Sequence, residues 1–140
     1  MTCLASGIIL YRRDGGAVRL LLLRNRDGGH WGFAKGRRTP DDAHEVHTAL
    51  REVQEETGYV ALSLHPGFRR ELEYQARGPG GEPYAKRVVY FLAEAPPDEP
   101  ALSSEHDRAT WVTADEAEPL LRHEQLRRLA RAACDAAAAS

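Results

Sequence analysis

The sequence predicts an α/β protein, a sandwich of helices around a mixed β-sheet, and three observations support this prediction. Several short apolar runs are bounded by glycine-rich or polar turns, which is typical of strands. Residues 68–76 alternate between a mostly apolar set of side chains and a polar set, as in a strand with one buried face. Segments of helical periodicity lie between and after these strands. Strands that alternate with helices favour an α/β sandwich.

The first half of the chain is predicted to contain a hairpin and one helix. Residues 6–11 form an apolar strand that ends at a turn over residues 12–16, and residues 18–23 form its partner strand. A short helix follows within residues 31–59. It ends at Gly58, because glycine readily adopts the left-handed conformation that follows many helices.

The second half is predicted to complete the sheet and to add two helices. A glycine-rich, flexible tip at 78–81 separates two strands, and Thr113 or Asp115 lies near the cap of the first helix. The alanine-rich tail, residues 136–140, is expected to fray, and residues 1–140 are assigned to one domain. The predicted strands are 68–76, 87–92 and 109–112, and the predicted helices are 115–121 and 123–134.

Composition narrows the class of protein. Hydrophobic residues make up 42% and charged residues 29% of the chain, which is ordinary globular usage. The net charge of −2 argues against broad electrostatic binding of nucleic acid. The sequence does not determine the oligomeric state. No apolar run approaches a membrane span and the N-terminus lacks a signal peptide, so we expect a cytoplasmic protein with no membrane partner. Cys3 and Cys134 are expected to be free, buried thiols.

The helix before Gly58 carries an unusual concentration of carboxylates. When the residues are placed around a helix at 100° per residue, four glutamates fall within an arc of about 100°. A different side of the helix carries mostly apolar side chains and suits the core. Carboxylates at i, i+3 and i+4 repel, at a cost of a few tenths of a kcal/mol per pair. A hard divalent cation such as Mg²⁺ would neutralise them. The glutamates are Glu45, Glu52, Glu55 and Glu56, and the core side holds Val46, Ala49, Leu50, Val53 and Thr57.

A short basic loop, Lys35-Gly36-Arg37-Arg38, precedes this acidic helix. Glycine allows the backbone to approach a ligand or metal closely, and the positive charges suit polyphosphate. A basic loop followed by an acidic helix therefore indicates a phosphate site bridged by metal. The alternative is a solvent-exposed acidic face beside an unrelated basic loop.

At these residues the chain resembles the Nudix hydrolases. Their signature ends in Arg-Glu-apolar-x-Glu-Glu-x-Gly-apolar, which this sequence matches throughout, at Arg51, Glu52, Val53, Glu55, Glu56, Gly58 and Tyr59. The resemblance implies the Nudix-type fold, an α/β/α sandwich with a mixed β-sheet. It also implies a hydrolase whose cofactor is Mg²⁺, with Mn²⁺ as a possible substitute.

The first half of the signature departs from the family pattern. Gly36 lies one residue too far from Arg51, so the loop carries one extra residue, and Ala43 stands where the pattern has a glutamate. In the family, that glutamate pairs with the motif arginine. Asp41, Asp42 or Glu45 must take its place here, and a Nudix-like binding module without catalysis is one alternative that this altered loop raises.

Segments outside the motif resemble the branch of asymmetric diadenosine tetraphosphate hydrolases. The matching segments are His30-Trp31 before Lys35-Gly36, GFRRELEY, KRVVYFLAE and SSEHDRATW. Ala34 replaces the branch's proline. The branch implies a nucleotide substrate, with diadenosine tetraphosphate cleaved to ATP and AMP. A pyrophosphohydrolase acting on nucleoside triphosphates, inositol pyrophosphates or RNA 5′ ends is the nearer alternative.

The resemblance assigns roles residue by residue. Glu52, Glu55, Glu56, Glu105 and the Gly36 carbonyl are the expected metal ligands. Glu52 is the expected general base, with Glu55, Glu56 or Glu105 as alternatives, and Arg51 orients the carboxylates. Tyr74 would stack a base, although it could be an ordinary cross-strand aromatic residue, and Trp31 is assigned to core packing. The expected substrate-binding residues are His30, Lys35, Arg37, Tyr74 and Lys86.

Overall fold

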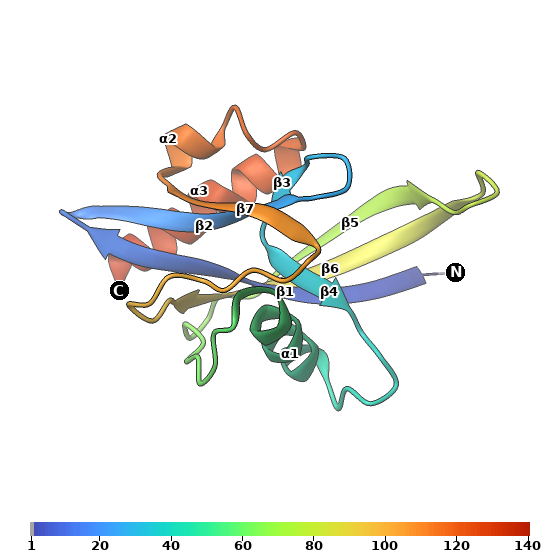
Figure 1. Cartoon of the computed structure of the whole chain (residues 1–140), viewed down its shortest axis with the longest axis horizontal. Helices are drawn as coiled ribbons and strands as arrows, with labels where there is room; N and C mark the ends of the chain where they lie inside the picture. Colours follow the sequence, from blue (N-terminus) through green and yellow to red (C-terminus); the bar gives the residue numbers. More distant parts are fainter. Residues whose placement is uncertain (1) are drawn as a thin grey trace.

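The structure is a computed structural model that describes residues 2–140. It is a sandwich of one mixed sheet between two helical layers, which confirms the predicted fold class (Figure 1). No helix of the described part is long and apolar enough to cross a membrane. The strands are β1 (Thr2–Asp14), β2 (Ala17–Asn25), β3 (Trp31–Gly32), β4 (Ala34–Arg37), β5 (Arg70–Arg77), β6 (Pro83–Glu94) and β7 (His106–Val112). The helices are α1 (Glu45–Thr57), α2 (Ala114–Ala117) and α3 (Glu124–Ala139).

The sheet has the order β3-β2-β1-β6-β5, with β4 paired to β1 and β7 paired to β2. Only the β1–β6 pair is parallel among the described pairings, which makes the sheet mixed. Strands β1 and β6 are longer than predicted because this pairing runs from Thr2 opposite Ala85 to Tyr11 opposite Glu94. Strands β3 and β4 were not predicted, since two and four residues give too little periodicity.

The two faces of the sheet bury separate cores. Helix α1 packs Ala49 and Val53 against the face that carries Ile8 and Leu10. Helix α3 packs on the opposite face, and Figure 1 shows α2 beside it. Val46 and Leu50, predicted for the core side of α1, are only partly buried.

Helix boundaries follow local capping. Thr113 forms a capping box with Glu116 and starts α2, which decides between the two predicted caps. Helix α2 ends at Ala117, four residues earlier than predicted. Gly58 ends α1 with a φ of 77°, as expected. Cys3 and Cys134 are free, but both are half-buried instead of buried.

The prediction that the alanine-rich tail frays is wrong. Helix α3 continues to Ala139, and Ala133 and Ala137 are fully buried against the sheet. Arg13 Nη2 donates a hydrogen bond to the Ala137 carbonyl at 2.9 Å. Alanine spaced every four residues gives a flat helix face that packs closely on the strands, so tertiary burial holds the tail.

We expect Ala137→Glu to lower the free energy of unfolding by about 1–3 kcal/mol, because it forces a charged group toward an apolar contact. The matched variant Ala138→Glu, at an exposed position of the same turn, should change it by no more than about 0.5 kcal/mol. Urea denaturation measures both. Equal effects would mean that the tail does not contribute to the core.

Candidate active site

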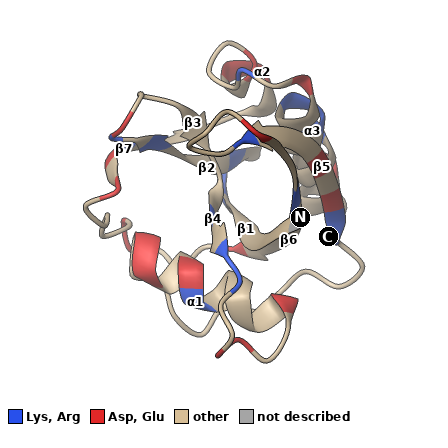
Figure 2. Cartoon of the chain, turned by 90° about the vertical axis from the view of Figure 1, so that its right-hand side faces the viewer, with Lys and Arg blue, Asp and Glu red and all other residues tan. Residues whose placement is uncertain are grey.

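A cavity of about 310 Å³ lies between α1, the first residues of β4, strand β5 and the start of α3. Five of the predicted site residues line it: His30, Lys35, Glu56, Tyr74 and Glu105. Trp31, assigned to core packing by the sequence, packs on the core and also lines this cavity. Figure 2 shows the acidic residues of α1 beside the basic residues of β4.

Strand register places the predicted cations on one face of the sheet. Lys35 lies opposite Gly7 of β1, and Lys86 lies opposite both Cys3 of β1 and Tyr74 of β5. Side chains of directly paired residues project from the same face, and β1 offers only small side chains there. Arg37 joins this face, opposite Ala5. Lys35, Arg37 and Lys86 therefore form one basic cluster on this face of the sheet.

The cations of this cluster influence one another. The pKa of Lys86 is lowered to about 8, mainly by burial and also by the charges of Lys35 and Arg37. Among residues 2–140, neither lysine has a carboxylate oxygen within 4 Å. Lys86 Nζ lies 5.9 Å from the centre of the Tyr74 ring. The cluster thus presents cations that an anionic ligand can pair with.

Glu56 is the most buried carboxylate of the cavity, with 4% of its surface exposed. The backbone N–H of Lys35 donates to its Oε1 at 3.2 Å. Burial raises the pKa of Glu56 to about 8, and the charges of Glu52 and Glu105 also raise it. Glutamates from α1 and from the loop before β7 therefore share one electrostatic environment.

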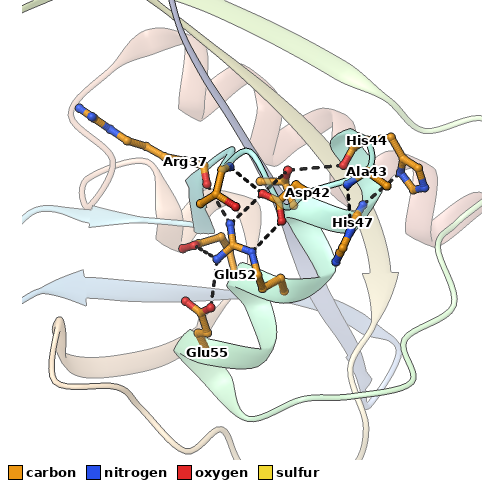
Figure 3. Close-up of polar contacts among 10 residues, drawn as sticks. Arg37, Asp42, Ala43, His44, His47, Glu52 and Glu55 are labelled. Atoms are coloured by element: carbon orange, nitrogen blue, oxygen red, sulfur yellow. Dashed lines mark hydrogen bonds and ion pairs between the residues drawn. The ribbon is translucent and has the colours of Figure 1, made fainter.

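The carboxylate of Glu52 lies directly over Gly36. A Cβ atom at residue 36 would overlap this carboxylate, so glycine is required for the approach. Arg51 Nη1 donates to Glu52 Oε2 at 2.8 Å and to Glu55 Oε2 at 3.0 Å (Figure 3). Burial raises the pKa of Glu52, and the charges of Glu55 and Glu105 add to that effect.

Asp42 takes the place of the missing motif glutamate. Its two oxygens accept from Arg51 Nε and Nη2, both at 2.9 Å, and also from the Thr39 N–H and the Thr48 hydroxyl (Figure 3). These hydrogen bonds, that of Arg51 first, hold the pKa of the Asp42 carboxyl well below its usual range. Of the other two candidates, Glu45 pairs with Arg69 and Asp41 is exposed.

The loop before β7 is fixed at both ends, and this positions Glu105. Ala101 N–H donates to the Thr57 carbonyl at 2.8 Å, just beyond the acidic part of α1. Arg26 holds the other end, since its backbone N–H donates to the Glu105 carbonyl at 2.8 Å and its Nε donates to the Ser104 carbonyl at 2.9 Å. Glu105 therefore extends from a constrained backbone, and it lines the same cavity as Glu56 of α1.

Two further residues of the cavity were missed by the sequence analysis. The ring of His123 is nearly parallel to that of Tyr74, with centres 6.4 Å apart and an interplanar angle of 18°. His123 precedes α3 but makes no side-chain capping bond, and Arg122 beside it also lines the cavity. The sequence shows only a histidine at the start of a predicted helix, which does not by itself indicate a binding role. A flat ring that stacks between two others at van der Waals contact requires about 7 Å between the outer rings, slightly more than the 6.4 Å between Tyr74 and His123.

These residues suit a divalent cation. Within residues 2–140, no three acidic, histidine or cysteine side chains are grouped closely enough to hold a metal ion, and Arg51 donates to Glu52 and Glu55. Buried carboxylates that raise one another's pKa are nevertheless the oxygen donors that Mg²⁺ and Mn²⁺ accept. The donor set therefore fits the cation that the motif implies.

The chain is similar to known proteins over most of its length. The NUDIX domain family model matches residues 1–133. A rat bis(5′-nucleosyl)-tetraphosphatase [asymmetrical] is 40% identical over 138 residues, which cover 91% of this chain and 90% of the relative. A protein of the same description from Caenorhabditis elegans is 32% identical, covering 84% of this chain and 83% of the relative. The crystal structure of a C. elegans Ap4A hydrolase binary complex superposes with a TM-score of 0.82 at 31% identity, over 92% of this chain and 93% of that one.

We expect Asp42→Asn to lower turnover by about tenfold or more, because Arg51 loses its anionic partner and no longer holds Glu52 and Glu55 in place. Asp42→Glu should recover part of the loss, whereas Asp41→Asn, at an exposed neighbour, should behave as wild type. Steady-state kinetics with saturating Mg²⁺ measures the effect. Normal turnover in Asp42→Asn would show that another group orients Arg51.

Proposed function

The chain belongs to the Nudix family, and from this premise we propose that it hydrolyses the polyphosphate chain of dinucleoside polyphosphates. Diadenosine tetraphosphate, cleaved to ATP and AMP, is the proposed substrate. The observation that carries the proposal is the combination of groups that line one cavity. A pair of nearly parallel rings, Tyr74 and His123, lines it together with the carboxylates of Glu56 and Glu105. Lys35 of the basic cluster lines the same cavity.

Each part of this arrangement suits one part of such a substrate. The rings of Tyr74 and His123 can take a base between them after a small opening, and stacking on an aromatic residue is worth about 1–3 kcal/mol per base. Lys35, Arg37 and Lys86 can neutralise the phosphates that follow the nucleoside. His30, at the rim of the cavity, is proposed as a further substrate contact.

Hydrolysis requires a phosphate held in line with an attacking water molecule. A divalent cation, Mg²⁺ or Mn²⁺, bound by Glu52, Glu55, Glu56, Glu105 and the Gly36 carbonyl, would neutralise phosphate charge and acidify a bound water. Glu52 is the proposed general base. Its Oε2 is occupied by Arg51, so Oε1, which lies over Gly36, is the oxygen available to accept a proton.

Arg51 acts as a positioning residue in this proposal. It donates to Asp42, Glu52, Glu55 and the Arg37 carbonyl, so it links the acidic helix to the basic loop. The carboxylates and the loop that carries the phosphate-binding cations are thereby kept at a fixed separation. Such preorganisation lowers the barrier for charge that develops during the reaction.

A substrate panel tests the function. The protein is incubated with diadenosine tetraphosphate, nucleoside triphosphates, an inositol pyrophosphate and a 5′-triphosphorylated RNA, with and without Mg²⁺. Products are identified by chromatography and mass spectrometry. Release of ATP and AMP only with the metal supports the proposal. Preferential cleavage of another class assigns the site to that class, and tight binding without cleavage would make the protein a binding module.

We expect Glu56→Gln to reduce turnover by at least about a hundredfold while the protein stays folded, because the substitution removes a carboxylate from the proposed metal site. Circular dichroism checks the fold, and calorimetric titration with Mn²⁺ checks metal affinity. Gln54→Glu, at an exposed position of the same helix, serves as a charge control. Undiminished turnover in Glu56→Gln would remove this residue from the metal site.

Tyr74→Ala is expected to raise the KM for dinucleotides about tenfold with a smaller change in kcat, since it removes a stacking surface. Tyr74→Phe keeps the ring and should retain the wild-type KM. If KM is unchanged in Tyr74→Ala, the base does not stack on this residue.

The depressed pKa of Lys86 predicts a pH dependence of substrate binding. Lys86 is charged below its pKa of about 8 and becomes neutral as the pH rises through that value. The KM should therefore increase above pH 8, by up to about tenfold at pH 9. Lys86→Arg, which stays charged throughout, should remove this increase. A parallel increase in both proteins would assign the titration to another group.

A further inference from the structure

Arg122 is a charged residue of the cavity that the proposed mechanism does not use. Its exposed side chain lines the cavity next to His123. Among residues 2–140 it has no carboxylate oxygen within 4 Å, in contrast to Arg127, Arg128 and Arg131 of the following helix. The guanidinium therefore has no anionic partner among these residues, and it lines the same cavity as the rings of Tyr74 and His123.

The backbone that carries Arg122 is fixed. Arg127 Nη1 donates to the Leu121 carbonyl at 2.8 Å and to the Arg122 carbonyl at 2.9 Å. Leu121 is itself buried in the core beneath the cavity. These hydrogen bonds therefore fix the position of the backbone from which the Arg122 side chain extends.

A second polar group of the same cavity also presents donors. Asn25 Oδ1 accepts a hydrogen bond from the Asp27 N–H at 2.9 Å, which leaves the amide NH₂ of Asn25 available. The carboxylates of the cavity, Glu56 and Glu105, are assigned to metal by the proposed function. The histidine rings and tyrosine hydroxyls of the lining can donate or accept. The Arg122 guanidinium and the Lys35 ammonium can only donate, and the proposed function assigns Lys35 to phosphate.

Donors discriminate between the two purines. Guanine presents two adjacent acceptors, O6 and N7, and a guanidinium donates to both. Adenine presents N7 as an acceptor but places an amino donor at N6, which opposes a second donor. From this complementarity we propose that Arg122 gives the stacking site a preference for guanine. The preferred substrates are then dinucleoside polyphosphates with at least one guanine base. This inference rests on the proposed function, since it concerns the base that lies between Tyr74 and His123.

The test compares kcat/KM for diguanosine tetraphosphate and diadenosine tetraphosphate in wild type, Arg122→Gln and Arg128→Gln. A bidentate contact at an exposed rim should favour guanine by about five- to tenfold in wild type. Arg122→Gln should lose this preference or reverse it, because an amide pairs with adenine N6 and N7. Arg128, on the exposed face of α3 outside the cavity, provides the matched control, and its variant should keep the wild-type ratio.

Two results would overturn the inference: equal use of both dinucleotides by wild type, or an equal loss with both in Arg122→Gln. The second result would place the guanidinium on the phosphate chain. As a second measurement, calorimetry gives the Kd of each dinucleotide for Glu56→Gln, so that the ratio of the two Kd values reports the preference without turnover. If wild type cleaves neither dinucleotide, the proposed function fails. The ratio of the two Kd values still decides whether the site prefers guanine.

Discussion

The position of one guanidinium, that of Arg51, determines how the acidic helix and the basic loop lie relative to each other. Its five donors reach Asp42, Glu52, Glu55 and the Arg37 carbonyl, so one side chain joins the loop, strand β4 and two turns of α1. Asp42 completes the arrangement from the other side, buried and held by Thr39 and Thr48. A guanidinium with this many hydrogen-bond partners has little conformational freedom, so it holds the surrounding carboxylates and the loop in fixed positions.

In the altered loop, Asp42 replaces the motif glutamate as the partner of Arg51. The family pattern supplies a glutamate to the motif arginine, and this chain supplies an aspartate one position earlier. An aspartate side chain is one methylene shorter, yet both of its oxygens accept from Arg51 at 2.9 Å. The hydrogen bonds from the Thr39 N–H and the Thr48 hydroxyl hold the carboxylate in this position. The departure from the motif therefore leaves the arginine anchored.

The sequence was informative where chemistry is local and less so where it depends on tertiary contacts. Helical spacing alone grouped Glu52, Glu55 and Glu56, and strand alternation placed Tyr74 on the buried face of β5. The choice among Asp41, Asp42 and Glu45 could not be made, because it depends on how the loop folds over Arg51. His123 could not be recognised either, since its partner Tyr74 is distant in sequence.

The basic cluster and the acidic helix lie close together, yet among residues 2–140 no ion pair within 4 Å joins Lys35, Arg37 or Lys86 to a glutamate of α1. The backbone N–H of Lys35 donates to Glu56, and the charge of its ammonium group acts to lower the pKa of both Glu56 and Lys86. Small side chains at Cys3, Ala5 and Gly7 leave the cations side by side, and Gly36 lets Glu52 lie against the loop. Like charges are thus kept adjacent at a cost in stability. A polyphosphate bound together with a divalent cation carries both complementary charges. The phosphates would relieve the repulsion among the lysines and Arg37, and the cation would relieve the repulsion among the glutamates. A free anion or a free cation would relieve only one of the two.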